Sequence, residues 1–260
     1  MKSIKYEDMD RIRGKRIRGT DRFAFQCRPE LSCFNRCCRN LNLFLYPYDV
    51  LRLRQGLGIS ADLFLTEYVD VVMRKGNYFP DVLLRMSDEG EHACVFSDDS
   101  GCRVYRDRPY TCRTFPVEFG IRYHAENRKT EVIGFFRPPE FCLGQKEMQD
   151  WTLQTWSGDQ EALTHQQMSE KWSEVKQLFQ KDPWGPEGPQ GKRAKMAFMA
   201  SYNMDAFRKF VFESSLLKRY RVKTALIKKI RSDDVELMLL GFDWIKLFVW
   251  GVQTHKIRLR

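Results

Sequence analysis

The 260-residue sequence lacks the short signatures by which common enzyme classes are identified. It contains no G-x-x-x-x-G-K-[ST] phosphate loop, no G-x-S-x-G nucleophile elbow and no H-E-x-x-H zinc-protease motif. The stretch from Gly56 to Ala61 has the letters of a dinucleotide fingerprint, but it follows a predicted helix instead of a strand. These absences argue against nucleotide-dependent enzymes, serine hydrolases and zinc proteases.

Long apolar runs are also missing. A membrane helix needs roughly 18–20 uninterrupted apolar residues, and the best candidate, Met238 to Val252, is interrupted by Asp243 and Lys246. The first 19 residues are charged throughout and lack the apolar centre of a secretory signal. We therefore expect a soluble, cytoplasmic protein that is not an integral membrane protein.

Eight cysteines are the unusual content of the chain, and none follows residue 142. A reducing cytoplasm does not favour disulfides, so thiols crowded into the first half of the chain indicate metal ligation. We expect six or more of them to be ligands. The candidate metal ligands form a first block, a second block and a single later residue: Cys27, Cys33, Cys37, Cys38; Cys94, Cys102, Cys112; and Cys142.

The spacing of the thiols bears on the metal. The first block reads C-x5-C-x3-C-C and the second C-x7-C-x9-C, and no C-x2-C knuckle of the zinc-finger kind occurs. Wide, irregular spacings favour an iron–sulfur cluster, of the 4Fe-4S type, because its corners lie several ångströms apart. Zinc stays an alternative if loops from distant segments converge on one ion.

Several residues near these thiols have two interpretations. The adjacent Cys37 and Cys38 either serve two metals, or one is a ligand while the other packs in the core. His92 could replace a thiolate, although a hydrogen-bonded structural role is favoured. The arginines among the second block either form an anionic-ligand pocket or lock the loop with salt bridges; they are Arg103, Arg106, Arg108 and Arg113.

The apolar patterns predict an α+β fold, mostly helical, with small antiparallel strands and loops that converge on a cysteine-ligated metal site. Expected strands are 71–74, 82–86, 117–124 and 131–136, the last two joined around Asn127-Arg128. Expected helices are 48–57, 61–69, 146–180, 193–202, 205–219, 222–231 and 234–250. We expect a metal-binding domain over 22–145 and a helical C-terminal extension over 146–260, with a Pro/Gly linker at about 182–192.

The net charge of +10 is concentrated locally. Residues 206–231 contain nine basic residues and one acid, Glu213. A solvated helix face is the favoured interpretation. The basic C-terminal helices are nevertheless the candidate surface for a protein partner, and nucleic acid stays open.

The cysteine blocks resemble the YkgJ-type cysteine-cluster family of zinc- or iron-chelating domains. The resemblance covers about residues 22–145. Its motifs are Phe25-x-Cys27, Cys33-x3-Cys37-Cys38-Arg39, Leu43…Tyr48-Asp49, Leu57-Gly58-Ile59-Ser60 leading into Phe64, Cys94-x-Phe96, Gly101-Cys102-x-Val-Tyr105 and Arg108-Pro109-x-x-Cys112-Arg113-x-Phe115-Pro116. The family implies metal binding. A related branch, the flagellin lysine N-methylases, implies S-adenosylmethionine-dependent methyl transfer.

Three functions follow from these observations. The first is an iron–sulfur protein for electron transfer, sensing or cluster-dependent chemistry. The second is a zinc-stabilised interaction module, and the third is a protein lysine methyltransferase-like enzyme. Whether the protein is an enzyme, and which small-molecule substrate it takes, stay open at this point, as do the catalytic residues.

Overall fold

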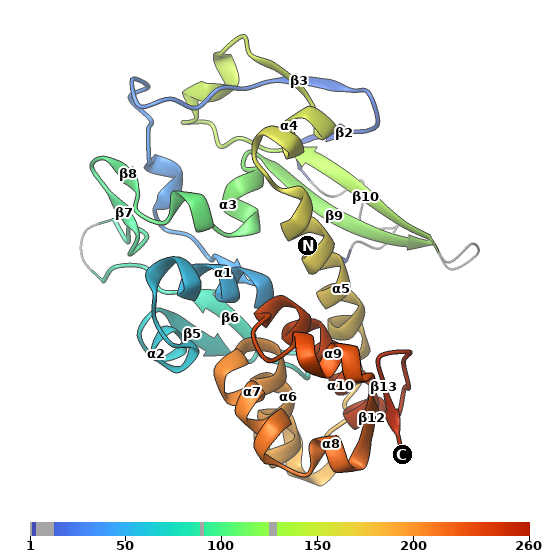
Figure 1. Ribbon diagram of the computed structural model, residues 1–260. Helices are drawn as coiled ribbons and strands as arrows, with labels where there is room; N and C mark the ends of the chain where they lie inside the picture. The colour runs from blue at the N-terminus through green and yellow to red at the C-terminus, as the bar shows by residue number, and fades with distance from the viewer. Residues whose placement is uncertain (1, 4–12, 89–90, 125–128) are drawn as a thin grey trace. The chain divides into compact units, whose positions relative to one another are not determined.

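The computed structural model describes residues 2–3, 13–88, 91–124 and 129–260 (Figure 1). They form two compact units, each assembled from two separate stretches of chain. Unit 1 comprises Met1–Leu41 and Met86–Ser173, and unit 2 comprises Asn42–Arg85 and Glu174–Arg260. Residues 42–85 are thus grouped with the C-terminal residues by compactness, and the domain division between residues 145 and 146 stays a prediction.

The main sheet of unit 1 has the order β1-β9-β10-β2. Its strands are β1 (Lys2–Ser3), β2 (Lys15–Ile17), β9 (Val117–His124) and β10 (Lys129–Phe136). The antiparallel pairing of β9 with β10 confirms the expected hairpin, whose turn at Asn127-Arg128 lies outside the described residues. Among the strands described, β1 and β9 form the one parallel pair.

Helix was expected throughout residues 146–180, and this prediction is wrong at its start. Residues Asp150–Thr152 form strand β11, which pairs antiparallel with β3 (Arg22–Ala24). The Thr152 side chain then accepts from the backbone N–H of Thr155 at 3.2 Å and caps α4 (Leu153–Asp159). Helix α5 (Leu163–Leu178) follows as a separate element. Pairing with a distant strand therefore overrides the local helical preference.

Aromatic rings form the core beside β3 and α4. Phe25 and Trp156 meet edge to face with ring centroids 5.6 Å apart, and Trp156 also contacts Phe23. The indole N–H of Trp151 donates to the carbonyl of Phe25 at 2.7 Å. These contacts fix the chain that leads directly into Cys27.

Unit 2 begins with a three-stranded antiparallel sheet of order β4-β6-β5. It consists of β4 (Phe44–Leu45), β5 (Val69–Val72) and β6 (Asp81–Leu84). Two helices expected from the sequence accompany it, α1 (Pro47–Leu57) and α2 (Ala61–Glu67). The Ser60 hydroxyl caps α2 by accepting from Leu63 N–H at 3.2 Å.

The C-terminal part of unit 2 is helical. Its elements are α6 (Lys192–Tyr202), α7 (Met204–Glu213), α8 (Leu216–Arg219), α9 (Thr224–Lys229) and α10 (Asp234–Trp250). The Asp233 carboxylate caps α10 as the sequence indicates. Gly241 lets α10 approach α6 closely, because a Cβ there would lie 2.1 Å from the carbonyl oxygen of Ala200.

Two sequence predictions in this region need correction. The helix expected over 205–219 breaks at Ser214, whose backbone is extended and whose hydroxyl accepts from Leu216 N–H at 3.1 Å. The helix expected over 222–231 starts later, because Val222 belongs to β12 (Tyr220–Val222), which pairs with β13 (Ile257–Leu259). Neither short strand was expected.

The Pro/Gly segment 182–192 is anchored within unit 2. It contains the 3-10 helix η5 (Gly185–Gln190). Trp184 is 2% exposed, and its indole N–H donates to the carbonyl of Tyr78 at 2.5 Å. The segment therefore packs on its own unit although its composition is that of a linker.

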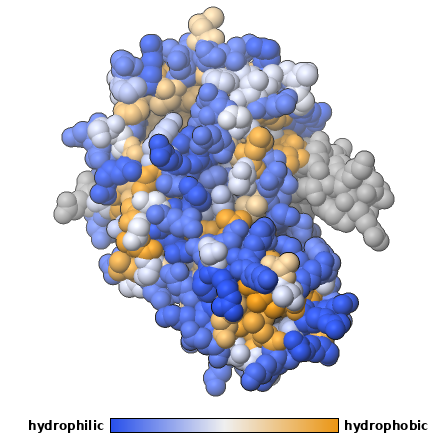
Figure 2. Space-filling model, viewed as in Figure 1, coloured by the Kyte–Doolittle hydropathy of each residue, from blue (hydrophilic) through white to orange (hydrophobic). Residues whose placement is uncertain are grey.

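On the face shown in Figure 2, hydrophilic residues predominate and hydrophobic residues form small separate patches. Within the described part of the chain, no helix has the length and apolar character needed to cross a membrane. The fold confirms the expected class, α+β and mostly helical, with small antiparallel sheets.

Candidate metal centre

All eight cysteines belong to unit 1, and all are free thiols. Most lie on loops or very short elements. Cys37 and Cys38 end the 3-10 helix η2 (Arg36–Cys38), Cys102 ends β8 (Gly101–Cys102), and Cys112 lies in α3 (Tyr110–Thr114). Cys142 directly precedes the 3-10 helix η4 (Leu143–Lys146). Figure 1 shows these segments as the loops around α3, β7 (Ser97–Asp98) and β8.

Backbone hydrogen bonds join the two cysteine blocks. The N–H of Cys94 donates to the carbonyl of Cys38 at 2.7 Å. Arg39 and Ala93 form an isolated antiparallel bridge beside this bond, and Asn40 N–H donates to the carbonyl of His92 at 2.9 Å. The first and second blocks therefore lie against each other although more than fifty residues separate them in sequence.

Cys142 joins the first block from the other end of the cysteine region. The backbone N–H of Leu143 donates to the Sγ of Cys33 at 3.2 Å, which holds the residue next to Cys142 against that thiol. Gln26 N–H donates to the carbonyl of Gly144 at 3.0 Å. A Cβ at residue 144 would lie 2.7 Å from the Gln26 carbonyl oxygen, so glycine permits this approach.

The pKa values of the thiols depend on burial and on neighbouring thiols. Burial raises the pKa of Cys27, and the nearby thiols of Cys142, Cys33 and Cys38 raise it further. Burial likewise raises the pKa of Cys142. Cys27, Cys33 and Cys142 are therefore neighbours, as a shared ligand set requires.

The vicinal pair connects two groups of thiols. A hydrogen bond to Cys38 raises the pKa of Cys37, as do burial and, more weakly, the thiols of Cys27 and Cys112. The hydrogen bond from Cys37 lowers the pKa of Cys38 to about 7, assisted by Ser97 and the positive charge of Arg39. The pKa of Cys37 thus responds to the thiols of Cys27 and Cys112, and Cys38 in turn raises the pKa of Cys27.

The remaining thiols lie near Cys38. Burial raises the pKa of Cys94 to about 11, and the thiols of Cys38 and Cys102 contribute. Burial also raises the pKa of Cys102, again with a contribution from Cys38. The electrostatics thus link Cys38 with Cys27, Cys94 and Cys102, and Cys37 with Cys27 and Cys112, while Cys33 and Cys142 raise the pKa of Cys27.

The donor chemistry fits a thiophilic metal. Within the described ranges, no three Cys, His, Asp or Glu side chains are arranged to hold one ion as they stand. The side chains that do approach one another are thiols, which suit zinc and iron–sulfur clusters. The N–H bond to Cys33 Sγ is of the kind that supports a metal-bound thiolate.

The arginines of the second block hold the loops in place. Arg103 donates to the carbonyl of Val95 at 2.6 Å, and Arg108 donates to the carbonyl of Tyr105 at 2.6 Å. Arg113 is buried and donates to the carbonyls of Arg106 and Gln160. These contacts fit the loop-locking interpretation of the arginine cluster.

Of two other residues near the thiols, the role of one was expected from the sequence and the role of the other was not. His92 Nδ1 lies 3.1 Å from the carbonyl oxygen of Ser87, the hydrogen-bonded role that was favoured. Ser97, which hydrogen-bonds Cys38, was not expected. Its only sequence signal is its position between Cys94 and the turn at Asp98, which indicates no particular partner.

Comparison with known proteins gives a family for this region. Residues 26–143 match a family model described as "Putative zinc- or iron-chelating domain". The matched range contains all eight cysteines and confirms the resemblance that the cysteine motifs indicate. No solved structure matches the chain.

Proposed function

Because residues 26–143 carry a domain of the zinc- or iron-chelating cysteine-cluster family, we propose that its thiolates hold an iron–sulfur cluster of the 4Fe-4S type. The protein uses this cluster for electron transfer, sensing or cluster-dependent chemistry. Eight free thiols need a reducing compartment, so we place the protein in the cytoplasm.

The observation that carries this proposal is the gathering of thiols from five chain segments in one unit. An iron–sulfur cluster takes cysteine thiolates at several separate corners, whereas a zinc ion takes four ligands at one point. The thiols are coupled in series: Cys142 with Cys27, Cys27 with Cys38, and Cys38 with Cys102. Such an extended set of donors fits an iron–sulfur cluster better than a single zinc ion.

The residues of this chain have distinct tasks in holding the metal. Cys33 and Cys142 bring the end of the domain to its beginning, and Leu143 N–H stabilises negative charge on Cys33. Arg39 favours the thiolate of Cys38. When bound, the cluster supplies one-electron chemistry, and the protein tunes it through these hydrogen bonds, charges and burial.

Zinc is the second candidate, because the family description names it and because four thiolates from distant loops suffice for a tetrahedral ion. In that case the domain is a metal-stabilised interaction module. Its metal would supply folding free energy, since thiolates bound to zinc exist only in the folded state.

Anaerobic purification followed by iron, acid-labile sulfide and zinc analysis distinguishes the candidates. The proposal predicts a brown protein with iron and sulfide in equal amounts and with visible absorption that decreases on reduction. A colourless protein with stoichiometric zinc would replace it with the zinc module. Parallel purification of a variant with Cys37→Ser and Cys38→Ser provides the control for adventitious metal.

A further inference from the structure

The ribbon of β12 and β13 in unit 2 presents two arginines that form no ion pair with the residues that the structure describes. Its register places Arg221 opposite Arg258 and Val222 opposite Ile257. Val222 and Ile257 are buried, whereas both arginines are exposed. Because side chains alternate along a strand, the apolar pair holds the ribbon on the core and the arginines are left at the surface.

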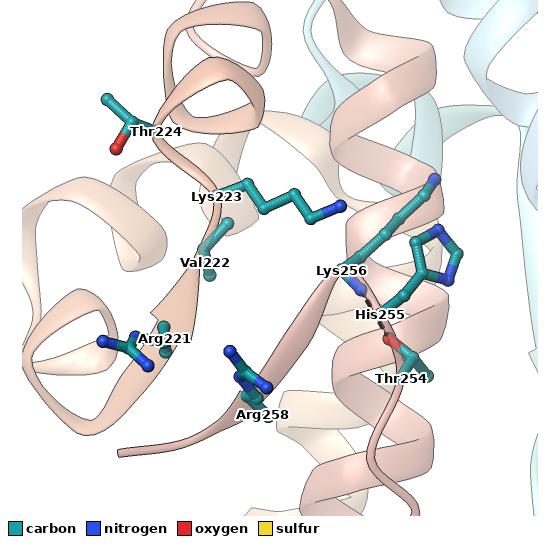
Figure 3. Close-up of a pocket in the computed structure, with 8 residues that line it drawn as sticks. All are labelled: Arg221, Val222, Lys223, Thr224, Thr254, His255, Lys256 and Arg258. Atoms are coloured by element: carbon teal, nitrogen blue, oxygen red, sulfur yellow. Dashed lines mark hydrogen bonds between the residues drawn. The ribbon is translucent and has the colours of Figure 1, made fainter.

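A pocket of about 480 Å³ opens beside this ribbon. Lys223 and Lys256, the next residues along the two segments, line it together with the arginines. Figure 3 shows the side chains of Lys223 and Arg258 directed into the space between the two segments that carry them. The ribbon thus forms a recessed positive site.

Some basic residues of this region form ion pairs, whereas three of the four in the ribbon do not. Arg208 pairs with Asp234, and Lys229 pairs with Glu236 at 2.6 Å. By contrast, Arg221, Lys223 and Arg258 form no ion pair with any residue that the structure describes. Lys256 reaches Glu236 only at 3.8 Å.

Like charges opposite each other in an antiparallel pair destabilise it. The Arg221–Arg258 pair therefore costs folding free energy that a bound anion would recover. Guanidinium groups also bind phosphate oxygens in a two-bond geometry.

We propose that this basic ribbon, defined by Arg221, Lys223, Lys256 and Arg258, binds the phosphate backbone of a single-stranded nucleic acid. The side chains that line the pocket are mostly basic or polar, with Val222 the one aliphatic among them, so the site lacks the apolar centre of a protein interface. Its recessed shape admits a strand more readily than a flat bilayer. The net charge of +10 attracts a polyanion over a longer range. The inference does not depend on which metal unit 1 binds.

Fluorescence anisotropy with the full-length, metal-loaded protein tests this site. The probe is a labelled single-stranded RNA of about 20 nucleotides, which exceeds the site of one strand-binding domain, titrated between about 50 and 200 mM salt. The test variant is Arg221→Ala/Arg258→Ala. The matched control, Lys75→Ala/Lys181→Ala, removes the same charge from exposed residues of unit 2 elsewhere.

The ribbon variant should bind the RNA at least about tenfold more weakly at low salt, with a salt slope smaller by about 1.4 for two lost phosphate contacts. Its melting temperature should stay equal or rise, because a repulsive pair is removed. The control should bind as the wild type does. Equal losses in both variants would mean non-specific attraction and overturn the proposal. The proposal would also be overturned if the wild-type protein did not bind the RNA but bound phosphatidylserine vesicles or polyglutamate.

Discussion

The backbone N–H of Cys94 donates to the carbonyl oxygen of Cys38 over 2.7 Å, and this bond joins the two cysteine blocks. Cys38 also carries the thiol whose pKa is lowered to about 7, through its bonds to Cys37 and Ser97 and the charge of Arg39. The same residue therefore connects the blocks and offers the most readily formed thiolate of the vicinal pair. The two cysteine blocks therefore contact each other at Cys38.

Gly144→Ala should weaken metal binding without removing a ligand. The added Cβ would lie 2.7 Å from the Gln26 carbonyl oxygen, so the Cys142 loop has to move away from Cys27. We expect a loss of about 1–3 kcal/mol in the free energy of unfolding, as for other overpacked sites, together with lower metal content. Chemical denaturation and metal analysis measure the two effects.

Gly158→Ala is the matched control, because a Cβ at residue 158 meets no atom within 4 Å. Gly158 lies in helix α4, where alanine is the better helix former. The control should keep its metal and its stability. Equal behaviour of the two variants would show that the close approach at Gly144 does not matter.

Arg113→Ala should destabilise unit 1 strongly. The guanidinium is buried and donates to two carbonyls, which would be left without donors. Hydrogen bonds that involve a charged group contribute about 1.5–3 kcal/mol each. Arg137→Ala, which removes an exposed pair with Glu118, should cost about 0–1 kcal/mol. Urea denaturation of both variants compares them, and similar losses would contradict the loop-locking role of Arg113.

Asp243→Asn should stabilise unit 2 at neutral pH. Burial raises the pKa of Asp243 despite the nearby Lys256, Lys246 and His255, so its charged form is disfavoured in the folded protein. The raised pKa means that the native state holds this proton more tightly. The contribution of Asp243 to the free energy of unfolding is therefore fully present below its pKa in the unfolded state. It is lost as pH rises through its pKa in the folded state.

The measurement for Asp243 is the melting temperature of wild type and variant across pH. The variant should be more stable at pH 7, and its advantage should vanish below about pH 3.9, where both forms are neutral. A constant difference at every pH would assign the effect to packing instead of charge.

Local signals in the sequence predicted much of the fold. Ser60 and Asp233 cap helices as their positions indicate, and the alternation in 117–124 and 131–136 gave the β9–β10 hairpin. Long-range pairing could not be predicted in this way. Residues 150–152 became a strand because β3 lies beside them, and Val222 left its expected helix to pair with Ile257.

In the candidate site, too, local features could be predicted from the sequence and long-range contacts could not. The cysteine motifs indicated the family, since a family match depends on residue types and distances along the chain, whereas the ligand set stays a prediction. Which thiols meet depends on backbone contacts between distant loops, such as Leu143 N–H to Cys33 Sγ. The spacing favours an iron–sulfur cluster over zinc, but the choice between them depends on the three-dimensional arrangement of the donors.

Metal content and melting temperature of Cys142→Ser, beside wild type, test most directly whether distant thiols share one centre. Cys142 lies against Cys33, so its loss should remove metal and global stability together even though the first block is intact. Cys112→Ser, near Cys37, should behave likewise. Full metal content and an unchanged melting temperature in both variants would show that the two blocks are independent and contradict the account.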